Sequence, residues 1–342
     1  MDTPKNNREI IITSLLNSSE PAIRYKTLVH LSGRQADAAQ LSAMQEAIRD
    51  SARVQTLLAE RDARGEIPRH PYSKWRGAHW VLSCLAEVGY PPGDHTLMPL
   101  LEQVYQWLLS AHHLRSVKTI AGRTRRCASQ EGNAVYYALA LGLEDERTEI
   151  LVKRLLQWQW PDGGWNCDKN PAAVNSSFHE SLIPMRALAL YGRRLSDSQA
   201  LQAAERAAEI FLKRELFRRQ KDGVVIHPDF VLLHFPYYWR YNFLFGLLVM
   251  SEAGFLSDPR CAPAVELLQA KQLPEGGFPA EKRYYRVSTS AQSGASAVDW
   301  GPTSPQKMNE FVSIDALRAL EAAGRDGRTR RQGARALRNA WG

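Results

Sequence analysis

The sequence predicts an all-α protein, and more specifically an α6/α6 toroid in which six inner helices surround a central cavity. Two observations predict this fold. Six apolar, helix-like segments each end at a glycine, and these glycines recur 50 to 70 residues apart along the chain. A more amphipathic segment precedes each of the six. Alternation of fully apolar and one-sided helices is the pattern expected of an inner and an outer helical ring.

The predicted inner helices are apolar nearly all round, as expected of buried helices. Each is followed by a glycine suited to the left-handed residue that ends a helix: Gly33, Gly89, Gly142, Gly192, Gly254 and Gly324. In chain order the segments are Ala22–Arg34, Gly77–Tyr90, Asn133–Leu143, Glu180–Gly192, Tyr241–Gly254 and Glu310–Gly324.

The predicted outer helices are apolar on one face and charged on the other: Arg8–Leu16, Ala38–Glu60 with a break near Asp50, Leu97–Ala111, Glu146–Gln157, Asp197–Phe217 and Pro259–Lys271. If the inner helices run parallel, the loops that lead into them gather at one mouth of the ring. These loops are long: Arg61–Ser73, Arg115–Ser129, Pro161–Ser176, Arg218–Trp239 and Leu273–Met308. Long loops in a compact domain commonly carry function, so we expect the site at this mouth.

Composition excludes several classes of protein. The 342 residues are 44% hydrophobic and 23% charged, an ordinary globular composition. No apolar run is long enough to cross a bilayer, and the first residues lack the pattern of a signal peptide. Four cysteines do not make a disulfide scaffold, so we expect a cytoplasmic protein with reduced thiols. The P-loop motif is absent, and no nucleotide cofactor is indicated.

The basic charge is concentrated at one end of the chain. The formal net charge is +8, but residues 325–342 hold six arginines and one aspartate and so carry +5 of it. Residues 1–324, the predicted single toroid domain, are nearly balanced, which disfavours a nucleic-acid partner. The basic tail is expected to make at most a peripheral contact with an anionic membrane surface. The oligomeric state is not predicted.

Two short motifs follow predicted outer helices. Gln159–Trp165 reads QWPDGGW and Gln272–Phe278 reads QLPEGGF. These resemble the QW repeat of squalene and oxidosqualene cyclases, with related turns in protein prenyltransferase β subunits. Over about residues 8–324 the chain is also similar to single-domain bacterial proteins described as squalene-cyclase-like. The resemblance implies a terpene-cyclase-like enzyme that cyclises, isomerises or transfers an isoprenoid or other lipid-like substrate in the central cavity.

The acid of squalene-type cyclases lies in an Asp-rich D-x-D-D motif, and this chain contains no Asp-Asp pair. Another acid is therefore required. The candidates at the mouth are Asp168, Glu180 and Asp299, with His179 beside them as a further catalytic candidate. A purely structural alternative exists for Glu180, because Ser177 and Glu180 have the spacing of a helix capping box.

The resemblance also implies zinc, which protein prenyltransferases hold with Asp, Cys and His, and lanthionine cyclases, on a similar toroid, with two Cys and one His. Cys127, Cys167 and His179 are expected at the same end of adjacent repeats, where they could hold a catalytic zinc ion. The alternative is two packed thiols and a histidine near a helix start. Cys84 and Cys261 fall within predicted helices and are expected in the core.

Aromatic and basic residues at the mouth are candidates for substrate binding. Ring faces could stabilise a carbocation, stack on sugars or simply fill the ring. The arginine pair before Cys127 could bind a diphosphate or carboxylate. The candidates are Trp80, Trp165, Trp239, Tyr241, Trp300, Arg125 and Arg126. We expect a small hydrophobic or anionic substrate. Three alternatives stay open: a zinc-dependent enzyme activating a thiol or water, a lyase or hydrolase on acidic sugars, and a non-catalytic lipid-binding protein.

Overall fold

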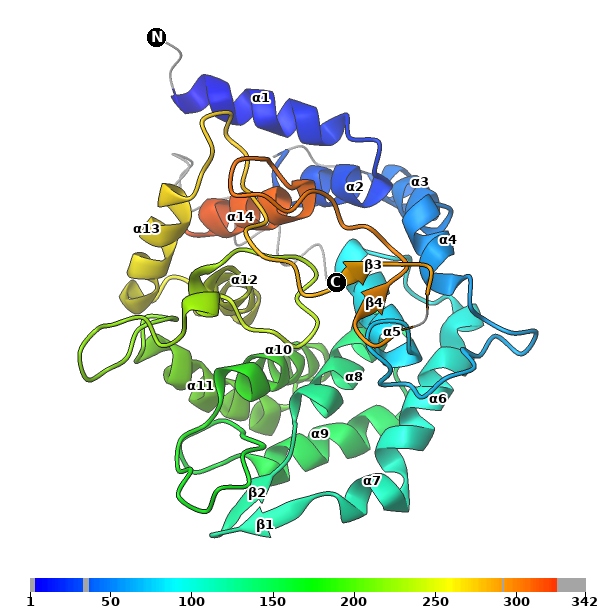
Figure 1. Cartoon of the computed structure of the whole chain (residues 1–342), viewed down its shortest axis with the longest axis vertical. Coiled ribbons are helices and arrows are strands. Elements are labelled where there is room, and N and C mark those ends of the chain that lie inside the picture. The colour runs from blue at the N-terminus through cyan, green and yellow to red at the C-terminus, as the bar shows by residue number, and fades with distance from the viewer. Residues whose placement is uncertain (1–3, 33–36, 291, 325–342) are drawn as a thin grey trace.

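The computed structural model describes residues 4–32, 37–290 and 292–324, and helices dominate it (Figure 1). The predicted all-α class is confirmed. The helices that correspond to the predicted inner set are α2 (Pro21–His30), α5 (Ala78–Val88), α8 (Ser129–Ala140), α10 (Phe178–Leu195), α12 (Phe243–Ala253) and α14 (Glu310–Ala322). Nearly all their residues from α5 onward are buried, as their apolar sequences require.

The remaining long helices alternate with these along the chain. They are α1 (Pro4–Leu16), α3 (Ala38–Arg49), α4 (Ala52–Leu58), α6 (Met98–Leu109), α9 (Glu146–Trp158), α11 (Ser198–Leu212) and α13 (Ala262–Ala270). The predicted break near Asp50 is confirmed, since Ser51 caps α4 by accepting a hydrogen bond from Val54 N. Helix α11 ends at Leu212, earlier than predicted. Short helices are α7 (Ala111–Arg115), η1 (His95–Leu97), η2 (Pro228–Val231) and η3 (Pro259–Cys261).

Contacts between helices follow a closed order. Helix α2 packs on α5, α5 on α8, α8 on α10, α10 on α12, α12 on α14, and α14 returns to α2. The alternating helices pack against this set from outside, as α1 on α2, α6 on α5, α9 on α8, α11 on α10 and α13 on α12 and α14. Figure 1 shows α1, α6, α9, α11 and α13 around the periphery. None of the helices in the described residues is long and apolar enough to cross a membrane.

The helix-ending glycines behave as predicted at four of six positions. Gly89 and Gly254 cap α5 and α12 in the left-handed conformation, and Gly142 and Gly324 also have positive φ. Gly33 lies outside the described residues. The prediction for Gly192 is wrong, because α10 continues through it to Leu195. A Cβ at Gly192 would lie 2.7 Å from Leu201 Cγ, so this glycine serves the close approach of α11.

The two sequence motifs build the same turn. In the first, Gln159 Nε2 donates to Gly163 O at 2.7 Å, and Trp165 N donates to Ser181 Oγ at 3.0 Å. In the second, Gln272 Nε2 donates to Gly276 O at 2.8 Å, and Phe278 N donates to Ser313 Oγ at 2.7 Å. Each motif therefore joins the end of one outer helix to the first turns of the next inner helix.

Charged side chains meet between the inner helices. Arg186 on α10 is only 6% exposed and pairs with Glu87 on α5 and with Glu252 on α12, the latter at 2.6 Å. Lys26 on α2 pairs with Asp315 on α14 at 2.6 Å. Since α5 and α10 are separated by α8 in the order of contacts, Arg186 reaches across the interior. The centre of the helical array is therefore partly filled by ion pairs.

Two small sheets complete the described structure. Strands β1 (Lys118–Ile120) and β2 (Arg123–Arg125) pair antiparallel across the turn at Ala121 and Gly122. Strands β3 (Arg286–Val287) and β4 (Ala295–Ser296) pair parallel within the long loop before α14. That loop is tied to the start of α5, because Trp75 N donates to Ala295 O at 3.2 Å. The predicted basic tail, residues 325–342, lies outside the described residues, and the predicted domain boundary stays a prediction.

Candidate metal centre

The loops that contain the predicted metal ligands Cys127 and Cys167 are paired through their backbones. Arg125, the last residue of β2, forms a parallel bridge with Asn166, and Arg126 N donates to Asn166 O at 3.2 Å. The bridge brings Cys127, two residues after Arg125 on the first loop, close to Cys167, the residue after Asn166 on the second. Cys127 then leads into α8, and the second loop leads into α10. Local backbone pairing thus brings together two cysteines that are 40 residues apart.

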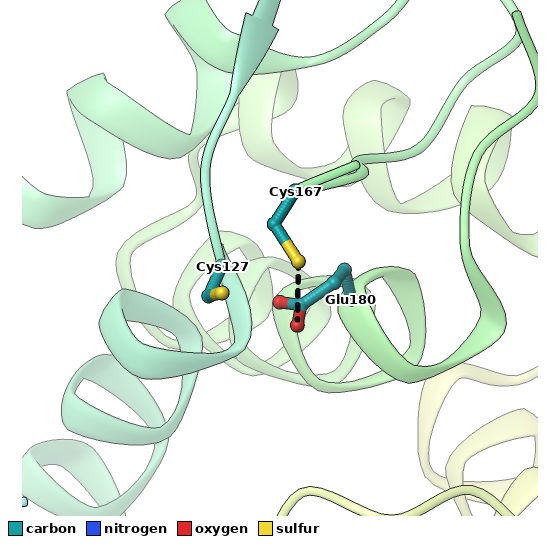
Figure 2. Close-up of side chains that lie close together, drawn as sticks. All are labelled: Cys127, Cys167 and Glu180. Carbon is teal, nitrogen blue, oxygen red and sulfur yellow. Dashed lines mark hydrogen bonds between the residues drawn. The ribbon is translucent and has the colours of Figure 1, made fainter. Parts of the chain in front are cut away.

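The two thiols converge on Glu180 in the first turn of α10 (Figure 2). The ligand atoms of Cys127, Cys167 and Glu180 all lie within 4.8 Å of one another. Cys167 Sγ donates to Glu180 Oε1 at 3.7 Å, and the other carboxylate oxygen accepts a hydrogen bond from Ser129 N at 3.0 Å. Glu180 therefore holds the first N–H of the neighbouring helix α8. The predicted capping box is wrong, because Ser177 makes no side-chain bond to its own helix.

The environment of the three groups raises two pKa values and lowers one. Burial raises the pKa of Glu180. The hydrogen bond to Cys167, followed by burial, raises the pKa of Cys127, whereas the same hydrogen bond lowers the pKa of Cys167. Cys167 is therefore the more acidic of the two thiols.

His179, predicted as the third metal ligand, lies elsewhere. Its Nδ1 accepts a hydrogen bond from Tyr241 N at 2.9 Å, and its ring packs edge-on against Trp239 at 5.3 Å. Burial lowers its pKa to about 4. Successive helical residues point about 100° apart, so only one of residues 179 and 180 can face the thiols. The structure groups the thiols with Glu180, and the ligand set is corrected accordingly.

The other two predicted acids are not part of this group. Asp168 is exposed, and its Oδ1 accepts a hydrogen bond from Asn170 N at 2.9 Å. Asp299 is also exposed, and its Oδ1 accepts from Gly301 N at 3.1 Å. Both carboxylates stabilise turns of their own loops, as short acidic side chains commonly do.

The predicted anion-binding pair is already engaged within the protein. Arg125 is 2% exposed, and its guanidinium donates to Asp168 O, Ala173 O and Ile120 O while stacking on a tryptophan ring. Arg126 donates to Ser116 Oγ at 3.2 Å and also contacts His113 and Gln130. These donors fasten the loop before Cys127 and are not presented to a ligand.

Most of the predicted binding aromatics are packing residues. Trp80, Trp165, Tyr241 and Trp300 are at most 1% exposed. Three of them direct their polar atom to a backbone carbonyl, namely Trp80 to Tyr72 O, Trp165 to Leu155 O and Tyr241 to Leu216 O. The Nε1 atoms of Trp239 and Trp300 are both buried with no acceptor in the described residues, and Trp239 differs from the other four in being only half-buried. Cys84 and Cys261 are buried in helices, as predicted.

Residues that the sequence analysis did not select surround the metal candidates. Tyr72 is hydrogen-bonded to Gln130 and lies near Glu180 and Cys127. Burial raises the pKa of Tyr72 to about 12. His113 Nε2 lies 2.8 Å from Glu131 Oε1, and both side chains are buried. In the sequence, only their location in the predicted mouth loops or at predicted helix starts could have indicated that these residues lie near the site.

The donor set fits zinc. Two thiols and one carboxylate are ligands that zinc accepts, and tetrahedral ligands at about 2.0–2.3 Å from the ion are about 3.5–3.8 Å apart. The observed separations, all within 4.8 Å, need only small side-chain adjustments. Three protein ligands leave a fourth position open, which is the arrangement of a catalytic zinc site.

Comparison with known proteins identifies no relative. No protein-family model matches the sequence, and a search of curated proteins finds no match. The function therefore has to be argued from the chain's own residues.

Proposed function

We propose that the chain is a zinc-dependent enzyme built on a terpene-cyclase-like α6/α6 toroid, with Cys127, Cys167 and Glu180 as the metal ligands. The closed order of contacts among the six inner helices supports the toroid, as does the identical turn formed by the two sequence motifs. The observation that carries the function is the convergence of three ligand atoms within 4.8 Å at the entrances of two neighbouring inner helices.

When bound in a site with three protein ligands, zinc supplies a Lewis acid that lowers the pKa of a water or thiol at the fourth position. The protein's own groups prepare the site. Ser129 N holds one oxygen of Glu180 and so directs the other toward the thiols. Because both thiols and the carboxylate must lose their protons to bind a metal, affinity is expected to rise with pH.

The isoprenoid substrate implied by the sequence remains a prediction, as do the sugar-acting and lipid-binding alternatives and the cytoplasmic location. An isoprenoid would require an apolar cavity between the inner helices. The described residues there include the buried pairs of Arg186 with Glu87 and Glu252, and of Lys26 with Asp315. Three of the four fully buried predicted aromatics, Trp80, Trp165 and Tyr241, donate hydrogen bonds to backbone carbonyls. The donor cluster is therefore the stronger basis for a function.

Metal analysis of the purified chain tests the proposal. Protein prepared without chelator is expected to contain about one zinc per chain, falling below about 0.1 in Cys127→Ser, Cys167→Ser or Glu180→Gln. Cys261→Ser is the matched control, because Cys261 is buried away from the cluster and should leave the zinc content unchanged. Circular dichroism verifies that each variant is folded.

Cobalt provides a second readout that does not depend on purification history. Replacement of zinc by Co²⁺ should produce a thiolate-to-cobalt charge-transfer band that weakens when either ligand cysteine is lost. A folded wild-type chain that takes up neither ion would overturn the proposal. So would zinc that persists in a folded variant carrying Cys127→Ser, Cys167→Ser and Glu180→Gln together.

A further inference from the structure

Two cations and a tryptophan occupy the mouth next to the metal candidates. Lys74 Nζ lies 5.2 Å from the ring centre of Trp239, and the guanidinium carbon of Arg240 lies 4.6 Å from the same ring. Among the described residues, neither cation forms an ion pair with a carboxylate. Burial, followed by repulsion from Arg240, lowers the pKa of Lys74. Two like charges are therefore held close together without a counter-charge.

Unsatisfied donors mark the same place. Trp239 Nε1 and Arg240 Nε are both buried and have no acceptor in the described part of the chain. Buried N–H groups nearly always find an acceptor, because leaving one without a partner costs about 1–3 kcal/mol. An oxyanion would satisfy these donors and neutralise the two cations at once.

The acidic group on the neighbouring loop is paired with other residues. Asp229 receives a hydrogen bond from Lys282 Nζ at 2.6 Å and another from Tyr284 Oη at 2.8 Å, so both of its oxygens are engaged. The Tyr284 ring in turn lies 4.0 Å from the Arg240 guanidinium and helps to hold it at the mouth. Among the described residues, no carboxylate forms an ion pair with Lys74 or Arg240, so an anion from outside them could take that position.

We infer that Lys74, Arg240 and Trp239 form a binding subsite for an oxyanion, the phosphate or carboxylate group of a substrate. Its position beside the metal candidates follows from two contacts. Lys74 lies near Cys127, and Trp239 packs against His179, the residue before Glu180. Assigning the anion to a substrate rests on the proposed zinc function, whereas anion binding itself does not.

This subsite replaces the predicted Arg125–Arg126 pair. The terminal nitrogens of those two guanidinium groups donate to backbone carbonyls and neighbouring side chains, although the Nε of each is buried without an acceptor in the described residues, as in Arg240. Lys74 and Arg240 carry the same charge, and among the described residues their side chains lie over aromatic rings without a hydrogen bond to a carbonyl or carboxylate. Arg125 and Arg126 therefore stabilise a loop, whereas Lys74 and Arg240 are available to bind an anion.

Calorimetric titration with inorganic phosphate tests the subsite, and a parallel titration with acetate distinguishes a phosphate site from a carboxylate site. The full chain is first treated with chelator, so that neither anion can bind through a metal. Saturable binding of one anion is expected, with affinity reduced at least about tenfold in Lys74→Met and in Arg240→Met. Arg283→Met, which removes an exposed arginine of the loop before α14, is the control and should change the affinity less than about twofold.

Thermal unfolding gives an independent measurement, since an anion that binds only the folded state raises the unfolding temperature by an amount that grows with the ratio of its concentration to its Kd. The gain seen with the wild type should shrink in both variants and reappear in Lys74→Arg. Absence of binding to the wild type would overturn the inference, and so would wild-type affinity in folded Lys74→Met and Arg240→Met. Because the experiment is metal-free, an absence of zinc would defeat the proposed function without affecting this result.

Discussion

Buried histidines are expected to limit the stability of this protein in acid, and His79 and His234 allow the effect to be calculated. Burial lowers the pKa of each imidazole to about 3. The Tyr137 hydroxyl lies 3.1 Å from Nδ1 of His79, and Asn242 Nδ2 lies 2.9 Å from Nδ1 of His234. Both rings therefore remain neutral in the folded protein well below neutral pH.

The unfolded chain behaves differently, because an exposed imidazole takes up a proton near pH ~6.5. Below that pH the unfolded state binds more protons than the folded state, so the free energy of unfolding falls as the pH drops toward about 3. At ~1.4 kcal/mol per pH unit, each histidine should cost about 2 kcal/mol at pH ~5, and the pair about 4 kcal/mol. Neither contributes above pH ~7.5.

Urea unfolding at pH ~8 and pH ~5 measures this cost. We expect His79→Phe, which keeps an aromatic ring but cannot be protonated, to lose about 2 kcal/mol less than the wild type between the two pH values. The exposed His95→Asn is the control and should follow the wild type. If the His79→Phe variant loses as much stability as the wild type, the imidazole does not stay neutral and the reasoning fails.

Three further predictions concern packing and turns. Arg186→Met should destabilise the fold by about 3–5 kcal/mol in urea unfolding, because Glu87 loses its partner while Glu252 keeps Arg318, and adding Glu87→Gln should recover part of the loss. Gln159→Ala removes hydrogen bonds to two carbonyl groups and should lower the free energy of unfolding by about 1–2 kcal/mol. Gln272→Ala removes one such bond and should cost about 1 kcal/mol. A larger loss for Gln272→Ala would contradict these hydrogen-bond roles. Gly77→Ala places a Cβ 2.2 Å from Pro71 O and should lower stability by about 1–3 kcal/mol, and an unchanged melting temperature would show that the loop yields.

The helical architecture could be predicted because its signal is local. Fully apolar segments of about three turns have one stable location, the interior, and a glycine in the left-handed conformation ends several of them. Gly192 shows where the local signal fails. It follows an apolar run as the other glycines do, but α11 packs Leu201 onto it and α10 continues. Contact with another helix, which no local pattern reveals, decided that position.

The candidate site could be predicted in part for the same reason. The two thiols lie on loops entering adjacent helices, and loop order alone places them at one end of the array. The third ligand depends on how α10 is rotated, because residues 179 and 180 point about 100° apart. That rotation is set where α10 meets α8, since a Cβ on Gly132 would lie 2.8 Å from Pro184 N. With the two backbones this close, Glu180 is turned toward Ser129 and the thiols, and His179 is turned toward Trp239.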